Sequence, residues 1–266
     1  MPIDVPITLP RLTHEEMRDI DYQVMAHAFA AHTELGRLCD EDVYKGDLTA
    51  RLNAAGLGPV RQELPVVVSY RDFAKPYRLD LVVADRVIYE AKAVSVLTSE
   101  HTAQLLNYLL LTNSTRGKLI NFRPQSVKSE FVNTALTHNR RQQFDLNQQR
   151  WRGDTSLVDL VCELLRDWGL FLEVSLYVEA LDHFLGGKDK VIQQVPMTRD
   201  GIRIGNQRFH LASSDTAFRI TAFTADLDHQ EGSLRRLLCH SPLKAMHWIN
   251  MNHHEVHFVT LLRQEV

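Results

Sequence analysis

The feature that most constrains this chain is a faint internal repeat, in which matching residues recur about 130 positions apart. Residues 36–44 (GRLCDEDVY) and 169–177 (GLFLEVSLY) share a glycine and a tyrosine at the same spacing. Residues 60–65 (VRQELP) are echoed by residues 191–196 (VIQQVP). Chance similarity between two unrelated segments is the alternative, but several elements recur in the same order, and this favours a duplication.

Apolar periodicity predicts the same kind of fold in each copy. In the first copy it predicts helices over 13–35, 40–56 and 99–113, and strands over 60–72, 77–84, 86–93 and 118–122. Thr13 and Glu16 have the spacing of a capping box, and Gly36 can end the first helix. In the second copy, helical stretches at 154–168 and 231–240 and a strand at 256–262 follow the same order. This order indicates an α/β fold, with a mixed sheet flanked by helices, present twice.

The length of 266 residues is sufficient for two small domains with separate cores. We expect a first domain over 1–125, a basic connector over 126–153, and the second α/β copy over 154–266. No apolar run approaches the roughly 18 residues that a membrane span needs, and no secretory signal is evident. Three scattered cysteines do not suit a disulfide framework, so we expect a reducing, cytoplasmic setting without a membrane partner.

Positive charge is concentrated in residues 116–152. This segment holds eight Lys or Arg and two acids, a net charge of +6, whereas the whole chain has a net charge of −3. The basic side chains alternate with four aromatic residues, and this combination suits the phosphates and exposed bases of a nucleic acid. Taken alone, the composition favours a solvated connector between two domains.

Three charged residues in the expected hairpin carry the strongest chemical signal. Asp80 stands in one strand, and Glu90 and Lys92 stand two apart in the next, so Glu90 and Lys92 point to one face. Antiparallel pairing can bring Asp80 beside Glu90. Two carboxylates suit Mg²⁺, and a lysine beside them can stabilise a phosphate or orient a water. An exposed sheet face with a Lys–Glu ion pair is the alternative, and the spacing alone favours it.

The wider pattern resembles the PD-(D/E)XK nuclease superfamily, and more narrowly the small bacterial family of GxxExxY proteins. The residues that carry this resemblance are Gly36, 41–44 (EDVY), 78–80 (RLD), 88–94 (IYEAKAV), 101–109 (HTAQLLNYL) and 119–122 (LINF). One departure is Leu38, where the family pattern has a second glycine. The resemblance implies a restriction-endonuclease-like mixed sheet flanked by helices, and it makes 1–125 a nuclease-like domain.

The resemblance also implies roles at a metal site. Asp80 and Glu90 would bind a divalent ion, Mg²⁺ or Mn²⁺, together with the carbonyl group of Ala91. Glu41 could add a further carboxylate, and Lys92 would assist the nucleophilic water or the scissile phosphate. A helix-surface position without a metal remains the alternative for Glu41.

Further residues are expected to reach the substrate. Gln104 would enter the site from the following helix, and Tyr108, one turn further, could position a phosphate. A solvated side chain and a core aromatic are the respective alternatives. The residues expected to contact nucleic acid are Tyr108, Arg116, Lys118, Arg123, Lys128, Arg140 and Arg141.

The second copy lacks the acidic residues. At an offset of 130 residues, the positions of Asp80, Glu90 and Lys92 are taken by His210, Ile220 and Ala222. We therefore expect a degenerate nuclease-like repeat that packs against the first copy, holds nucleic acid, binds a partner protein or self-associates.

Together these features predict a Mg²⁺-dependent nuclease that hydrolyses phosphodiester bonds, with DNA favoured over RNA. The alternative is a non-catalytic module that holds nucleic acid or a protein on a nuclease-like scaffold, or a subunit of a larger complex.

Overall fold

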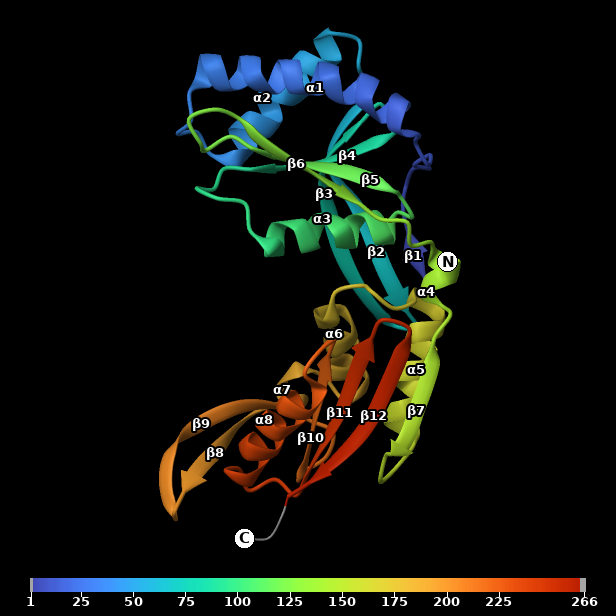
Figure 1. Cartoon of the computed structure of the whole chain (residues 1–266), viewed down its shortest axis with the longest axis vertical. Helices are drawn as coiled ribbons and strands as arrows, with labels where there is room; N and C mark the ends of the chain where they lie inside the picture. Colours follow the sequence, from blue (N-terminus) through green and yellow to red (C-terminus); the bar gives the residue numbers. More distant parts are fainter. Residues whose placement is uncertain (1, 264–266) are drawn as a thin grey trace. The chain divides into compact units, whose positions relative to one another are not determined.

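Two six-stranded mixed sheets, flanked by helices, organise the chain (Figure 1). The computed structural model describes residues 2–263, and each sheet belongs to one compact unit, Met1–His138 or Asn139–Val266. The expected α/β fold class, with a second copy of similar architecture, is confirmed. No helix within residues 2–263 combines the length and the apolar character needed to cross a membrane.

The first unit contains one sheet with strand order β1-β2-β3-β4-β5-β6. Its strands are β1 (Ile3–Asp4), β2 (Val60–Tyr70), β3 (Phe73–Val83), β4 (Val87–Lys92), β5 (Arg116–Asn121) and β6 (Lys128–Asn133). Its helices are α1 (His14–Leu35), α2 (Glu41–Ala54) and α3 (Ser99–Leu111). Only β4 and β5 pair in parallel, and α3 forms the crossover that a parallel connection requires.

Local sequence signals explain where these elements begin and turn. The Glu16 N–H donates to Thr13 Oγ1 at 3.2 Å, and the Glu16 carboxylate accepts the Thr13 N–H at 2.9 Å, which confirms the capping box of α1. Ala84 and Asp85, with φ of 55° and 51°, form the tight turn between β3 and β4. The predicted hairpin is therefore present.

The sheet of the first unit is covered on both faces, by α1 and α2 on one side and by α3 on the other (Figure 1). The face below α1 and α2 is apolar and buries Leu81, Val83, Tyr89, Ala91 and Ile120 among side chains of the two helices. Because side chains alternate, Glu90 and Lys92 point to the opposite face. On that face, α3 packs closely against Gly117 of β5. A side chain at this position would crowd α3, because its Cβ would lie 3.1 Å from Leu105.

The second unit repeats this arrangement in its own sheet, with strand order β7-β12-β11-β10-β9-β8. Its strands are β7 (Asp145–Arg150), β8 (Ile192–Arg199), β9 (Ile202–Leu211), β10 (Thr216–Thr221), β11 (Ala245–Asn252) and β12 (Glu255–Leu262). Its helices are α4 (His138–Arg141), which begins at the unit boundary, α5 (Ser156–Trp168), α6 (Val174–Phe184), α7 (Lys188–Val191) and α8 (Leu227–Cys239). From α5 to β12 the strand pairing follows that of α1 to β6, including one parallel pair, β10 with β11, connected through α8.

The glycine and tyrosine of the sequence repeat make the same contact in both units. Gly36 ends α1 with φ 73° and ψ −161°, and Gly169 ends α5 with φ 77° and ψ 175°. Tyr44 Oη donates to the Gly36 carbonyl at 2.6 Å, and Tyr177 Oη donates to the Gly169 carbonyl. These backbone angles are accessible essentially only to glycine, which explains why the residue recurs.

An asparagine on the fifth strand of each repeat makes a second shared contact. Asn121 Nδ2 donates to the Val94 carbonyl at 2.8 Å, and its Oδ1 accepts the Val94 N–H at 3.1 Å. Asn250 makes the same pair of hydrogen bonds with Phe223, at 3.0 and 2.9 Å. The two asparagines therefore fix the structural correspondence between the units.

This correspondence corrects the residue matching that was expected from the sequence. Thr221 pairs with Asn250 as Lys92 pairs with Asn121, so the charged positions of β4 correspond to Arg219 and Thr221. The offset falls from 133 residues at the glycines to 129 at the asparagines. The strands of the first hairpin are shorter in the second unit, with 8 and 10 residues in β8 and β9 against 11 in each of β2 and β3. His210, Ile220 and Ala222 are therefore one residue beyond the true counterparts.

The segment 126–153, expected as a connector, contains two strands. β6 is the edge strand that pairs with β5, and β7 is the edge strand that pairs with β12. Both strands are polar and mostly exposed, so they lack the apolar alternation by which a strand is recognised in sequence.

The two glycines allow a matched test of this design. Gly36→Ala strains the backbone but brings no atom within 4 Å of the new Cβ, so we expect a loss of about 1–3 kcal/mol. Gly169→Ala adds an overlap at 2.7 Å with Arg141 Cβ, so we expect a larger loss. All three tryptophans (Trp151, Trp168 and Trp248) lie in the second unit. Urea unfolding followed by tryptophan fluorescence therefore reports the second unit, while far-UV circular dichroism reports both. Equal losses in the two variants would contradict this account.

Candidate active site

The candidate site lies at the strand fork, the point where β3 and β4 separate. Their pairing covers Leu81–Val83 with Val87–Tyr89 and goes no further. Asp80 and Glu90 are the next residues on each strand, so both stand at the fork. Asp80 Oδ2 accepts the Ala91 N–H at 3.0 Å, a hydrogen bond that links the strands where their regular pairing has ended.

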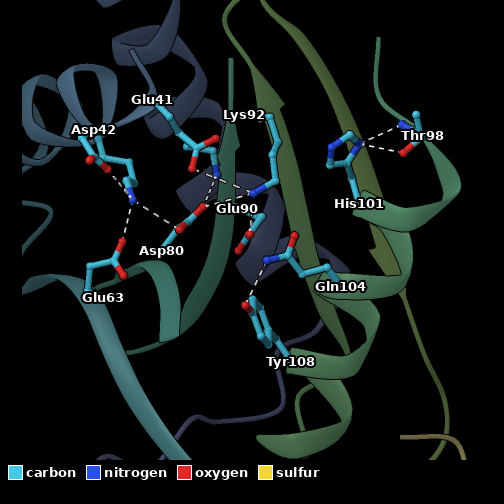
Figure 2. A network of polar contacts seen from close by, with 12 residues as sticks. Glu41, Asp42, Glu63, Asp80, Glu90, Lys92, Thr98, His101, Gln104 and Tyr108 are labelled. Atoms are coloured by element: carbon cyan, nitrogen blue, oxygen red, sulfur yellow. Dashed lines mark hydrogen bonds and ion pairs between the residues drawn. The ribbon is translucent and has the colours of Figure 1, made fainter. Parts of the chain in front are cut away.

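Lys92 brings the charged residues of the fork together (Figure 2). Its Nζ lies 2.7 Å from Glu90 Oε1, 3.7 Å from Asp80 Oδ2 and 4.0 Å from Glu41 Oε1. Glu41 is the first residue of α2, and this helix end places it near the end of β4. The structure thus gathers Asp80, Glu90, Lys92 and Glu41, as expected from the sequence.

These ionisable groups are largely removed from water. Asp80, Glu90 and Lys92 are 7%, 1% and 8% exposed. Burial, followed by the nearby Asp80 charge, raises the pKa of Glu90 to about 8, even though Lys92 acts in the opposite direction. Burial lowers the pKa of Lys92, but Glu90, Asp80 and Glu41 together outweigh this effect, and the pKa is raised overall. Burial also raises the pKa of Glu41.

Lys45 is a residue of the site that sequence reasoning missed. Its Nζ lies 2.5 Å from Glu63, 2.9 Å from Asp42 and 3.5 Å from Asp80 Oδ1, and the residue is buried. Burial lowers the pKa of Lys45, but the hydrogen bonds to Glu63 and Asp42 raise it overall. Its position four residues after Glu41, on the same face of α2, is the sequence signal that could have identified it.

The site carries more negative than positive charge. The carboxylate cluster consists of five residues, Glu41, Asp42, Glu63, Asp80 and Glu90, and two ammonium groups, those of Lys45 and Lys92, contact it. Within residues 2–263, no group hydrogen-bonds the buried Oε2 of Glu90. An uncompensated buried carboxylate oxygen among other acids fits a divalent cation, since such ions prefer oxygen ligands.

The carboxylate cluster does not form a ready cage for a metal ion. Within residues 2–263, no set of three or more His, Cys, Asp or Glu side chains is placed to hold one. Two acids, Asp80 and Glu90, flank the fork, whereas Glu41 lies on the far side of Lys92 Nζ (Figure 2). This arrangement does not favour Glu41 as a direct third ligand.

Gln104 and Tyr108 lie together on α3. Gln104 Nε2 donates to Tyr108 Oη at 3.0 Å, and Figure 2 shows this pair on the α3 side of Glu90. Tyr108 is 7% exposed, and its ring packs edge-on against Tyr77 with centroids 6.4 Å apart. Tyr108 is therefore largely a core aromatic whose hydroxyl group meets the site through Gln104.

Three of the basic residues expected at a nucleic-acid surface have structural contacts instead. Lys118 is buried below α1, with its Nζ 2.6 Å from Asp21 and 4.2 Å from the Phe131 ring centroid. Arg123 donates to the backbone carbonyls of Arg37, Cys39 and Ala93. Arg141 is 1% exposed and donates to the carbonyls of Trp168 and Leu170. Of the expected basic set, Lys128 and Arg140 are exposed and Arg116 is partly buried.

Comparison with known proteins connects the first unit to a nuclease family. Residues 18–134 match the family model of the PD-(D/E)XK nuclease superfamily. The matched segment includes the strand fork and α3, and it covers less than half of the chain. The superfamily resemblance seen in the sequence is thus confirmed for the first unit. Searches of curated proteins and of solved structures returned no match.

The raised pKa of Glu90 predicts a pH dependence of stability. Its pKa in the folded state, about 8, exceeds the ordinary 4.5, so the folded protein binds this proton more tightly than the unfolded chain does. In metal-free buffer, the free energy of unfolding should fall as pH rises from about 5 to about 8. Glu90→Gln should remove most of this slope, whereas Glu100→Gln, at an exposed position of α3, should keep it. Urea unfolding across this range, with EDTA present, measures the slope. A wild-type stability that rises with pH would contradict the assignment.

Proposed function

We propose that the first unit is a metal-dependent nuclease and that the strand fork is its active site. The observation that carries this proposal is the buried group of Asp80, Glu90 and Lys92 at the fork, inside the segment that matches a nuclease superfamily. A plain structural core would not favour such a group, because buried ions destabilise a fold unless they are fully paired.

A divalent ion fits the oxygen atoms at the fork. In this proposal Asp80 and the partnerless Oε2 of Glu90 bind the ion, with the Ala91 carbonyl and water completing the ligands. Mg²⁺ is the proposed physiological ion, and Mn²⁺ can replace it. When bound, the ion supplies positive charge that stabilises the phosphate and promotes the ionisation of water.

The side chains around the fork have distinct proposed roles. Lys92 Nζ, now shared among three carboxylates, orients the attacking water or neutralises the scissile phosphate. Glu41 would accept hydrogen bonds from water beside the ion and would not bind the ion itself. Lys45 holds Asp80 in place as a positioning residue. Gln104, with its amide group fixed by Tyr108, faces the substrate from α3.

The proposed substrate is nucleic acid, and DNA rather than RNA. The superfamily match supports a nucleic-acid substrate. The exposed Lys128 and Arg140 and the partly buried Arg116 are the remaining candidates for phosphate contacts. We also propose a reducing cytoplasmic setting, which suits the free cysteines Cys39, Cys162 and Cys239.

Substitutions at the fork test the activity. We expect cleavage of a DNA substrate with Mg²⁺ or Mn²⁺ and none with EDTA. Glu90→Gln and Lys92→Ala should each lower the cleavage rate by about 10²-fold or more, since each removes charge stabilisation from a buried site. Glu100→Gln is the matched control and should keep wild-type activity. Salt-sensitive DNA binding without turnover under any divalent ion would instead favour a non-catalytic binding module.

Metal binding can be measured without a substrate. Mn²⁺ should raise the thermal midpoint of the first unit, because an ion that binds only the folded state stabilises it. Glu90→Gln should abolish this rise, and Glu41→Gln should reduce it only in part. In a crystal soaked with Mn²⁺, anomalous density should lie between Asp80 and Glu90. Density elsewhere, or an undiminished rise for Glu90→Gln, would contradict the assignment.

A further inference from the structure

The second unit has a cavity at its own strand fork. The pairing of β9 with β10 covers only His210–Leu211 with Ala217–Phe218, and the strands separate beyond Phe218. A cavity of about 210 Å³ opens there. Its lining consists of Val178, Arg208, Phe209, His210, Phe218, Arg219, Ile220 and Met246. In the repeated topology this is the place that the carboxylate cluster occupies in the first unit.

The charge at this place is reversed between the two units. Arg219 stands at the position of Glu90 according to the strand pairing, and Arg208 comes from the neighbouring strand β9. Neither guanidinium forms an ion pair with a carboxylate of residues 2–263, and both residues are exposed. Two unpaired guanidinium groups beside a cavity form a site for an anion.

His210 is held in one orientation by a buried acid. Its Nδ1 lies 2.7 Å from Asp182 Oδ1, and Asp182 of α6 is 1% exposed. The ring also packs edge-on against Phe218, with centroids 5.5 Å apart. Because Asp182 accepts a hydrogen bond from Nδ1, the other ring nitrogen, Nε2, is left for a ligand in the cavity.

We propose that this cavity binds a phosphate group directly, without a metal ion. Arg208 and Arg219 supply forked N–H donors, which match phosphate oxygens, and His210 Nε2 adds a further hydrogen-bonding atom. The volume accommodates a phosphate with a few waters. The end of a nucleic-acid strand and free phosphate are the two sources of such a group that the test below distinguishes. This site stands apart from the hydrolysis proposed for the first unit.

Binding to the full-length protein in EDTA tests the site, since these conditions prevent metal-dependent cleavage. The probes are inorganic phosphate, measured by calorimetry, and two labelled oligonucleotides of one sequence, with a 5′-phosphate or a 5′-hydroxyl, measured by fluorescence anisotropy. Arg208→Gln, Arg219→Gln and His210→Phe should each weaken phosphate binding about tenfold or more. Arg208→Lys keeps the charge without the forked geometry and should fall between wild type and Arg208→Gln.

The matched control is Arg203→Gln, on the same strand and outside the cavity, where Arg203 donates to Asn206. This variant makes the same change of charge and should bind phosphate as the wild type does. Circular dichroism and tryptophan fluorescence verify that each variant is folded.

The outcomes separate the proposal from its rivals and from the nuclease proposal. Preference for the 5′-phosphorylated oligonucleotide supports a strand end as the source, and binding of inorganic phosphate alone supports a free phosphate. No saturable binding by the wild type, or equal weakening in Arg203→Gln, would overturn the site. Cleavage by the first unit is not used in these measurements, so either proposal can fail while the other stands.

Discussion

The contact between Lys92 and Glu90 is the constraint around which the first unit is arranged. It lies at the place where two strands separate, and burial there raises the free energy of any unpaired charge. The surrounding fold accommodates it by giving one sheet face to an apolar core and the other to α3 and the fork. Apolar burial below α1 and α2 thus provides the stability that allows a destabilising polar cluster on the opposite face.

The two units share one scaffold but differ in the residues at the strand fork. Both retain the glycine–tyrosine contact and a single parallel strand pair in the repeated core. Both also retain the asparagine that hydrogen-bonds a residue just beyond the end of the neighbouring strand. These shared features maintain the fold and carry no chemistry of their own. The residues at the fork differ completely, with acids in one unit and arginines in the other. Chemistry in this architecture therefore varies at one place while the scaffold remains.

Much of the fold and part of the site could be predicted from local patterns. The capping box of α1, the hairpin about Asp85 and the grouping of Glu90 with Lys92 follow from spacing alone. The spacing of Lys45 from Glu41 places both residues on one face of α2, but the contact of Lys45 with Asp80 also depends on how α2 packs on the sheet. The burial of Arg141 could not be predicted, since composition does not show which basic side chains are covered. The edge strands β6 and β7 were not recognised because they are polar and lack apolar alternation.

The hydrogen bond from the Ala91 N–H gives the Asp80 carboxylate a structural role in addition to its proposed chemical one. The carboxylate replaces a missing strand partner as well as facing the proposed ion, so truncating Asp80 disturbs the sheet and the chemistry together. An asparagine there keeps an oxygen acceptor for the amide and removes only the charge. Architecture and reactivity are thus joined in one side chain, and an isosteric replacement is the means of separating them.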